Sequence, residues 1–299
     1  MFATHPLHLP DLDVFREPDR HNPTVLRRVL AGLLRRRRQE AGVGARQAAE
    51  VLGCHASTVS RIENWGEGIT EHSVSVLLRL YGVGERDIAL CVELVRELPN
   101  AGWWKSFDDV LTDWFDRFIA LQEASSTIRT YELQLVPGLL QTKEYATWVA
   151  RGKPYVTPDE VDRLVQLRLR RQELVWRSDA PNLWVLLHEN VLGMPGGGHQ
   201  VMRKQLERLV EAAQEPHITL QLTQMRDDYC PPVTNPITYL RFDQLGLPDT
   251  VYLEDLDGAR FLDGRVACDP YRSVLDTLLN YAVDPDDTIR LLKAKAQSL

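Results

Sequence analysis

The chain has 299 residues and a formal net charge of −7; 44% of its residues are hydrophobic and 26% are charged. These proportions exclude a wholly disordered chain, and the length allows one large domain or two of ordinary size. The acidic total argues only weakly against a nucleic-acid partner, because net charge describes the whole chain whereas binding uses one face.

No apolar run approaches the ~20 residues that a membrane-spanning helix needs, and the first residues lack the basic and apolar regions of a secretory signal. The cysteines, none of which forms a CxxC pair, are Cys54, Cys91, Cys230 and Cys268. This scatter argues against a zinc ribbon and a disulfide scaffold. We therefore expect a cytoplasmic protein that binds no metal and no cofactor.

The N-terminal third divides into an arm and a helical domain. Residues 1–22 hold three prolines and little periodicity, which favours a flexible, extended arm. From Pro23 the apolar residues recur at i, i+3, i+4 and i+7, as on one face of a helix. The further predicted helices are 45–52, 56–64, 70–81 and about 85–98. Five short helices predict a compact all-α domain over residues 23–100.

Beyond residue 100 the pattern becomes mixed. The aromatic-rich stretch 103–118 fits an amphipathic helix, and residues 128–136 read as extended. Further helices fit 141–151, 158–176, 199–213, 266–283 and 286–297. Partly alternating, β-branched stretches predict strands at 183–188, 217–225, 237–242 and 250–256. Residues 101–299 should therefore form an α/β (α+β) domain whose last strands pair antiparallel, and which serves regulation, dimerisation or partner binding.

The most informative stretch is residues 41–65, AGVGARQAAEVLGCHASTVSRIENW. A helix-turn-helix needs a small residue where its helices cross, a glycine in the tight turn and buried aliphatics on the second helix. Ala49 and Gly53 have this spacing, and Val59 and Ile62 share one face of the second helix. The sequence therefore predicts a helix-turn-helix whose second helix turns that face inward.

The outward face, found at 100° per residue, carries hydrogen-bonding side chains. Arginine pairs with guanine and asparagine with adenine, whereas Ser and Thr suit either base or phosphate. Free backbone N–H groups at the start of the helix also suit a phosphate, and so does an arginine opening the preceding helix. The predicted DNA-contacting residues are Arg46, His55, Ala56, Ser57, Thr58, Ser60, Arg61 and Asn64.

Charge is unevenly distributed along the chain. Residues 23–64 contain eight arginines and three glutamates, a net +5, so the remainder carries −12. Because the chain contains this basic segment, DNA remains a candidate partner despite the acidic total. The acidic remainder could attract a basic protein. For the run Arg35–Arg38, phosphate contacts and salt bridges to acidic neighbours both stay open. Glu63, beside the buried edge of its helix, favours a structural ion pair.

Residues 24–83 resemble the Xre/lambda-repressor-type helix-turn-helix family, most closely in GCHASTVSRIENW. The rest resembles the domain that follows this module in actinobacterial antitoxin-like regulators. The strings that carry this second resemblance are WWKSFDDVLTDWF, IRTYELQLVPGLLQTKEYA and RLVQLRLRRQELV, with VPGLLQT the most specific. The chain departs from the first family at Gly44–Arg46, where a Ser/Thr cap and a glutamine are usual, and at His55, where Ser or Thr is usual.

These features indicate a sequence-specific DNA-binding transcriptional regulator that is nucleoid-associated when bound to DNA. Its helix 56–64 would enter the major groove, and a homodimer would read a palindromic operator. The resemblance implies a small protein partner encoded nearby. Two alternatives stay open: a protein-neutralising antitoxin or scaffold with only autoregulatory DNA binding, and a small-molecule-gated repressor with a closed C-terminal pocket and an effector that the sequence does not identify.

Other motifs give weak or negative signals. The aromatic residues Trp103, Trp104, Trp114 and Phe115 recur at helical spacing, which favours a core or a subunit interface over a ligand cage. His188-Glu189 lacks the second histidine of HExxH, and the glycines at 196–198 suggest a flexible loop rather than a nucleotide-binding motif. Cys54 is expected to be a small buried residue. No motif in the sequence indicates an enzyme.

Overall fold

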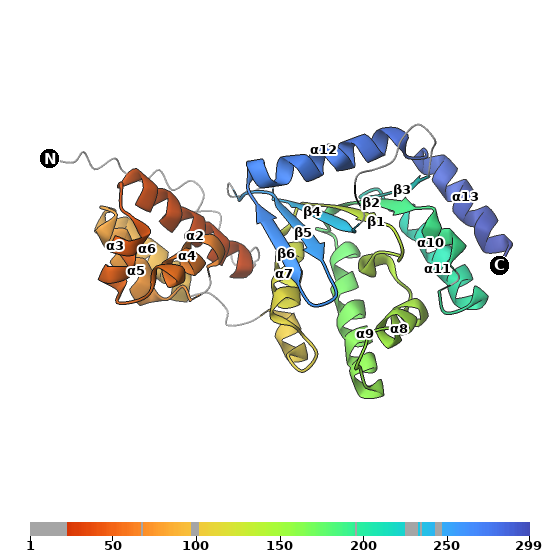
Figure 1. The fold of residues 1–299 in the computed structure, drawn as a ribbon, viewed down its shortest axis with the longest axis horizontal. Helices are drawn as coiled ribbons and strands as arrows, with labels where there is room; N and C mark the ends of the chain where they lie inside the picture. Colours follow the sequence, from red (N-terminus) through yellow and green to blue (C-terminus); the bar gives the residue numbers. More distant parts are fainter. Residues whose placement is uncertain are drawn as a thin grey trace. The chain divides into compact units, whose positions relative to one another are not determined.

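The computed structural model describes residues 23–66, 68–96, 102–194, 196–224, 233, 235–242 and 247–299. The predicted arm 1–22, the end of the helix predicted to reach residue 98, and Cys230 lie outside the described residues. The described residues up to Trp103 belong to one compact unit, and those of Trp104–Phe242 and Pro248–Leu299 form a second. In Figure 1 the first unit is red to orange and the second runs from yellow to blue.

The first unit is all-helical in its described residues. Its helices are α2 (Pro23–Glu40), α3 (Ala45–Leu52), α4 (Ala56–Trp65), α5 (Glu71–Leu80) and α6 (Glu85–Arg96). Local sequence explains their ends: a capping box between Thr70 and Ser73 opens α5. Gly53, at φ +67°, ends α3 in the left-handed region that suits a residue without Cβ.

The core of the first unit forms where α2 and α3 meet α4, with α5 packed against α3 and α2. Leu30 and Leu34 of α2 pack in the same interior as Val59 and Ile62 of α4, all at most 2% exposed. The buried Ala49 on α3 has no long side chain to hold the two motif helices apart. The predicted inward face of α4 is thus confirmed.

The second unit contains a mixed sheet. Its strands are β1 (Thr127–Glu132), β2 (Asn182–His188), β3 (Ile218–Thr223), β4 (Ile237–Arg241), β5 (Thr250–Glu254) and β6 (Ala259–Asp263). Among the described residues they follow the order β3-β2-β1-β4-β5-β6. Strands β1 to β3 pair in parallel, and β4 to β6 pair antiparallel, as predicted for the last strands. The sequence analysis did not predict β6. This strand lies half-buried at the edge of the sheet, and its apolar and polar residues do not clearly alternate.

Helices cover both faces of this sheet (Figure 1). They are α7 (Asp113–Ala124), α8 (Lys143–Arg151), α9 (Pro158–Gln172), α10 (Asn190–Gly193), α11 (His199–Ala212), α12 (Arg265–Tyr281) and α13 (Pro285–Gln297). Three 3₁₀ turns accompany them, η3 (Trp103–Phe107), η4 (Gly138–Leu140) and η5 (Glu173–Val175). The prediction of a helical domain followed by a mixed α/β domain is confirmed, and no described helix is long and apolar enough to cross a bilayer.

The two faces of the sheet bury different partners, because side chains alternate along a strand. Tyr131 on β1 and Val251 on β5 pack with Leu275 of α12 in one core cluster. Their neighbours Thr130 and Tyr252 point to the opposite face, which α7 and α9 cover (Figure 1). One residue of register therefore decides whether a side chain joins the α12 core or the space beneath α7 and α9.

The predicted helix over 103–118 is wrong, because the segment breaks into η3 and α7 with a turn at 108–112. Arg163 on α9 donates to both carboxylate oxygens of Asp109, at 2.8 and 2.9 Å, and so holds the turn outside the helix. Thr112, extended at ψ 151°, then starts α7, whose first turn carries two aspartates. The predicted helix 158–176 likewise ends earlier, at Gln172, where η5 begins.

Candidate nucleic-acid interface

The turn between α3 and α4 is closed by backbone hydrogen bonds. The Gly53 N–H donates to the Glu50 carbonyl, and the Cys54 N–H to the Ala49 carbonyl at 2.9 Å. Cys54 is half-buried rather than fully buried as expected, because its Sγ lies at the turn, 3.6 Å from the His55 carbonyl oxygen. The turn fixes the angle at which α4 leaves α3.

The outward face of α4 has the residues that the helical spacing predicts. Ser57, Ser60 and Arg61 are exposed, and Thr58 and Asn64 are half-buried. His55 is the exposed N-cap residue and Ala56 is half-buried. Arg46 is exposed in the first turn of α3. The structure thus places these residues on the turn, on α4 and at the start of α3; contact of each with DNA stays a prediction.

The N-terminal ends of both motif helices lack a side-chain cap. Neither Gly44 before α3 nor His55 before α4 accepts a side-chain hydrogen bond from its helix. Within the described chain, the N–H groups of Ala56 and Ser57 have no acceptor, because the first bond to His55 comes from Thr58. These N–H groups and the helix dipole favour an anion at the start of α4.

A hydrogen-bonded chain joins α2 to the outward face of α4. Arg35 Nη1 donates to Asn64 Oδ1 at 2.9 Å, and Asn64 Nδ2 donates to Ser60 Oγ at 3.0 Å. Each end of the Asn64 amide therefore already makes one hydrogen bond within the unit. These bonds restrain the orientation of Asn64, whereas Arg61 makes no hydrogen bond or ion pair with any described residue.

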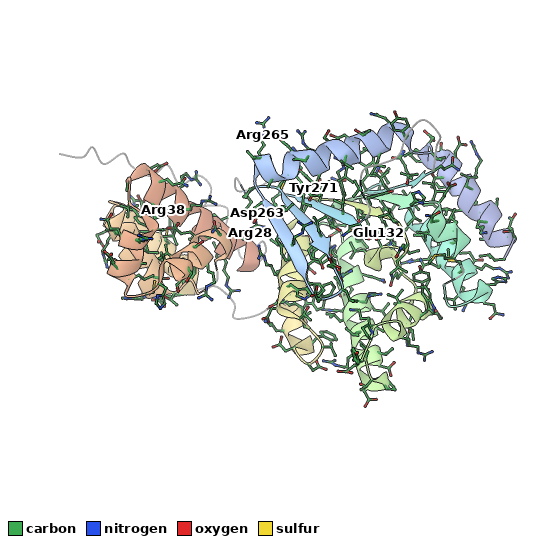
Figure 2. The ribbon with its side chains drawn as sticks, in the orientation of Figure 1. Arg28, Arg38, Glu132, Asp263, Arg265 and Tyr271 are labelled. Carbon is green, nitrogen blue, oxygen red and sulfur yellow. The ribbon has the colours of Figure 1, made fainter. Side chains whose placement is uncertain are left out.

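A buried carboxylate fixes α4 against its neighbours. Glu63, 3% exposed, accepts from Arg38 Nε at 2.8 and 3.0 Å and from the Tyr81 hydroxyl at 2.9 Å. Arg38, labelled in Figure 2, also donates to the Val43 carbonyl at 3.0 Å. Burial, and then the charge of Glu63, raises the pKa of Tyr81, so its hydroxyl remains a donor. The predicted structural ion pair of Glu63 is confirmed.

The four arginines of the run Arg35–Arg38 on α2 have different contacts. Arg37 pairs with Glu40 one turn along the same helix, at 2.8 Å, and Arg38 pairs with Glu63. Arg35 reaches Asn64, and Arg36 is exposed without a carboxylate partner among the described residues. Salt bridges therefore account for Arg37 and Arg38, and phosphate contact stays open for Arg35 and Arg36.

The second unit contains a cavity of about 760 Å³ between its sheet and helices α7 and α9. Its aromatic walls are Trp114, Phe115, Phe118, Trp148 and Tyr252. This placement of Trp114 and Phe115 differs from the expected core or interface. Trp104 is buried, as a core position should be, and Trp103 is half-buried.

The sequence analysis did not predict the charged side chains that line this cavity. Glu132 of β1, labelled in Figure 2, lines it together with Arg168 and Arg171 of α9. Burial, and then the charge of Glu254, raises the pKa of Glu132 to about 8. The sequence contains one sign of them. Val161, Leu164 and Val165 form the apolar face of α9, and Arg168, seven residues after Val161, lies on that same face.

The other motifs have structural explanations. His188 is buried; its Nδ1 accepts from the Asn190 N–H at 3.2 Å, and burial lowers its pKa. Gly198, at φ +95°, is the N-cap residue of α11. Cys54, Cys91 and Cys268 are free thiols. Among the residues that the structure describes, no group of three or more His, Cys, Asp or Glu could hold a metal ion.

Comparison with known proteins agrees with the division of the chain into a helical unit and a mixed α/β unit. Residues 29–90 match a family described as helix-turn-helix domain, which supports DNA binding. Residues 115–294 match the family described as domain of unknown function (DUF5753). No curated protein and no solved structure matches the chain. Because the second match spans more than half of the chain, the protein belongs to the DUF5753 family, with a helix-turn-helix domain preceding that region.

Proposed function

We propose that the protein is a sequence-specific DNA-binding transcriptional regulator of the Xre type, acting in the cytoplasm on chromosomal DNA, and not an enzyme. One observation carries the proposal: α4 presents exposed Ser57, Ser60 and Arg61 beside an uncapped helix start. Ser57 and Arg61 form no hydrogen bond within the described chain, so both side chains are available to bases or phosphates. The helix-turn-helix match supports the same class of function.

In the proposed complex α4 lies in the major groove and α3 crosses the phosphate backbone. The uncapped N–H groups of α4 and Arg46 on α3 bind phosphates and set the register, whereas Arg61 reads a base edge. Two copies of the chain form a homodimer, and its half-sites lie about one helical turn apart.

Replacing Arg61 by alanine tests this assignment. Loss of a bidentate guanine contact should weaken operator binding by about 1–3 kcal/mol and relax the preference at one base pair. Fluorescence anisotropy with DNA from upstream of the protein's own coding sequence measures the affinity, at one stated salt concentration because phosphate contacts are salt-dependent. A scrambled duplex of equal length measures the non-specific part.

Arg86→Ala is the matched control. Arg86 is an exposed arginine on α6, which packs against α5 and α2, and it has no ion pair within the described chain. Both variants lose one positive charge, so a general electrostatic effect should appear in each. Equal affinities and equal base preference in Arg61→Ala and in the wild type would remove Arg61 from the reading surface.

The cavity favours a second candidate, a repressor or activator gated by a small molecule. Its volume of about 760 Å³ lies within the ~300–1,000 Å³ range of ligand sites. A ligand that binds only one conformation of the second unit would shift the DNA-binding equilibrium by its difference in affinity for the two conformations. Operator binding measured with and without a cavity ligand tests this gating.

The antitoxin-like alternative rests on the resemblance and on the acidic charge outside residues 23–64. It predicts that the full chain carrying Arg61→Ala still retains a small basic protein, because neutralising a partner needs no DNA contact. Co-purification with the product of the neighbouring gene, at low and at high salt, measures this. A partner that requires intact DNA binding would contradict it.

A further inference from the structure

The cavity contains a buried cation that forms no ion pair with any described residue. Burial lowers the pKa of Arg171, and the charges of Glu254 and Glu132 oppose that shift without contacting the guanidinium. Arg171 of α9 is 6% exposed, and its Nε has no hydrogen-bond partner. Its guanidinium carbon lies 5.1 Å from the ring centre of Phe115 and 5.7 Å from that of Phe118. Within the described chain it forms no ion pair and no hydrogen bond. Burying a charge without an ion pair costs free energy, and an anion bound in the cavity would offset that cost.

A second polar group in the same wall is also unsatisfied. Gln122 of α7 lines the cavity at 3% exposure, and its Oε1 has no partner. Native proteins leave few buried polar atoms unpaired, and those that remain require an explanation such as a bound ligand or water. Two residues with such atoms, Gln122 of α7 and Arg171 of α9, therefore line one largely apolar cavity.

The formal charge of the lining is positive. Its basic residues are Arg151, Lys153, Arg168 and Arg171, and its acidic residues are Glu132 and Glu254. The raised pKa of Glu132, about 8, leaves that carboxyl largely protonated at neutral pH. Glu254 accepts from the Tyr252 hydroxyl at 2.8 Å. Cations thus outnumber carboxylates in the lining of the cavity.

The segment VPGLLQT holds the cationic wall in place. Gln141 donates to the Val136 carbonyl at 2.7 Å, and its Oε1 accepts from Arg168 at 2.5 Å. A Cβ at Gly138 would collide with Nη2 of Arg171, so a larger residue there would displace that guanidinium. The loop and α9, which both line the cavity, therefore position the two guanidinium groups.

We propose that this cavity binds a small organic oxyanion: a flat apolar molecule whose carboxylate or phosphate group pairs with the Arg171 guanidinium. The apolar body lies against the rings of Trp114, Phe118 and Tyr252. The planar fork of arginine binds such oxygens in pairs, and the low polarity of the walls strengthens the contact. The proposal deepens the gated-regulator candidate, but binding itself does not depend on DNA recognition.

Isothermal titration calorimetry on the full chain tests it with three matched probes, 2-naphthoate, 2-naphthyl phosphate and the neutral 2-naphthamide. We expect at least one anion to bind tenfold or more tightly than the amide. The two anions distinguish a carboxylate site from a phosphate site. Equal binding of all three probes, or binding of none, would overturn the proposal.

Arg171→Met keeps the length of the side chain and removes its charge, so it should abolish the preference for the anion. A merely structural arginine would destabilise the protein when replaced, whereas an unpaired buried cation should leave the melting temperature of the ligand-free protein unchanged or raised. Arg170→Met is the control, because Arg170 is the preceding residue on α9, exposed and paired with Glu173 at 2.7 Å.

A preference that survives in Arg171→Met, or that disappears equally in Arg170→Met, would contradict the assignment. If Arg171→Met does not fold, Lys153→Met replaces it, because Lys153 lines the cavity from an exposed loop. That variant should lower anion affinity about threefold, and an unchanged affinity would count against a cationic cavity. The DNA measurements on Arg61→Ala are separate, so either proposal can fail alone.

Discussion

Replacing Arg38 by methionine is expected to destabilise the helix-turn-helix domain and to abolish operator binding. The change leaves the Glu63 carboxylate buried with the Tyr81 hydroxyl as its remaining side-chain partner. Removing one partner of a fully buried ion pair costs ~3–5 kcal/mol. Because the Arg38 side chain is 17% exposed, we expect about 3 kcal/mol, a large part of the ~5–15 kcal/mol that holds a domain folded.

Native-state hydrogen exchange read by mass spectrometry assigns this loss to the correct unit. The amides of α4 should lose protection in Arg38→Met, while those of β1 and β2 should not. Arg37→Met is the matched control on the same helix. It breaks the surface pair with Glu40, which is worth ~0–1 kcal/mol.

The double variant Arg38→Met, Glu63→Leu tests the cause. If the cost comes from an uncompensated buried charge, removing the charge should restore much of the stability. If the double variant is less stable than Arg38→Met alone, Glu63 stabilises α4 mainly through the Tyr81 hydroxyl or through packing. Operator binding should follow stability in this series, because none of these side chains lies on the exposed face of α4.

The first unit could be predicted because its determinants are local. The turn depends on Gly53, four residues after Ala49, and the inward face of α4 depends on Val59 and Ile62 at helical spacing. Charge type and burial also predicted the role of Glu63. The partners of Arg35 could not be predicted, because helical spacing places a side chain on a face without naming the neighbour across from it.

The cavity could not be predicted because its parts are distant in sequence. Glu132, Arg171 and Tyr252 come from β1, α9 and β5, and only the register of the sheet brings them to one face. A one-residue shift of β1 would send Glu132 to the α12 side. The aromatic stretch was misread for a related reason: the Arg163–Asp109 contact that breaks it comes from α9, outside the stretch itself.

Glu132 should make the stability of the second unit fall as the pH rises from about 5 to 8. Burial raises its folded-state pKa to about 8, against an ordinary value of 4.5. The folded state therefore holds the proton more tightly than the unfolded chain does. The resulting stabilisation is complete below pH 4.5 and is lost progressively until pH exceeds 8, with a total of about 4–5 kcal/mol.

Urea unfolding followed by tryptophan fluorescence measures this, because five of the seven tryptophans lie in the second unit. The difference between wild type and Glu132→Gln isolates one carboxyl from His188, whose lowered pKa gives the opposite slope. Glu254→Gln is the companion variant. Removing its charge should lower the pKa of Glu132 and move the transition to lower pH.

A wild-type stability that parallels Glu132→Gln between pH 5 and 8 would mean that Glu132 is already ionised in the folded protein. Its charge would then be compensated by Arg171, the nearby cation that lowers the Glu132 pKa. Arg171 would in that case need no external anion. The same titration therefore bears on the ligand: a pKa near 8 leaves the Arg171 charge available to an oxyanion, and an ordinary pKa does not.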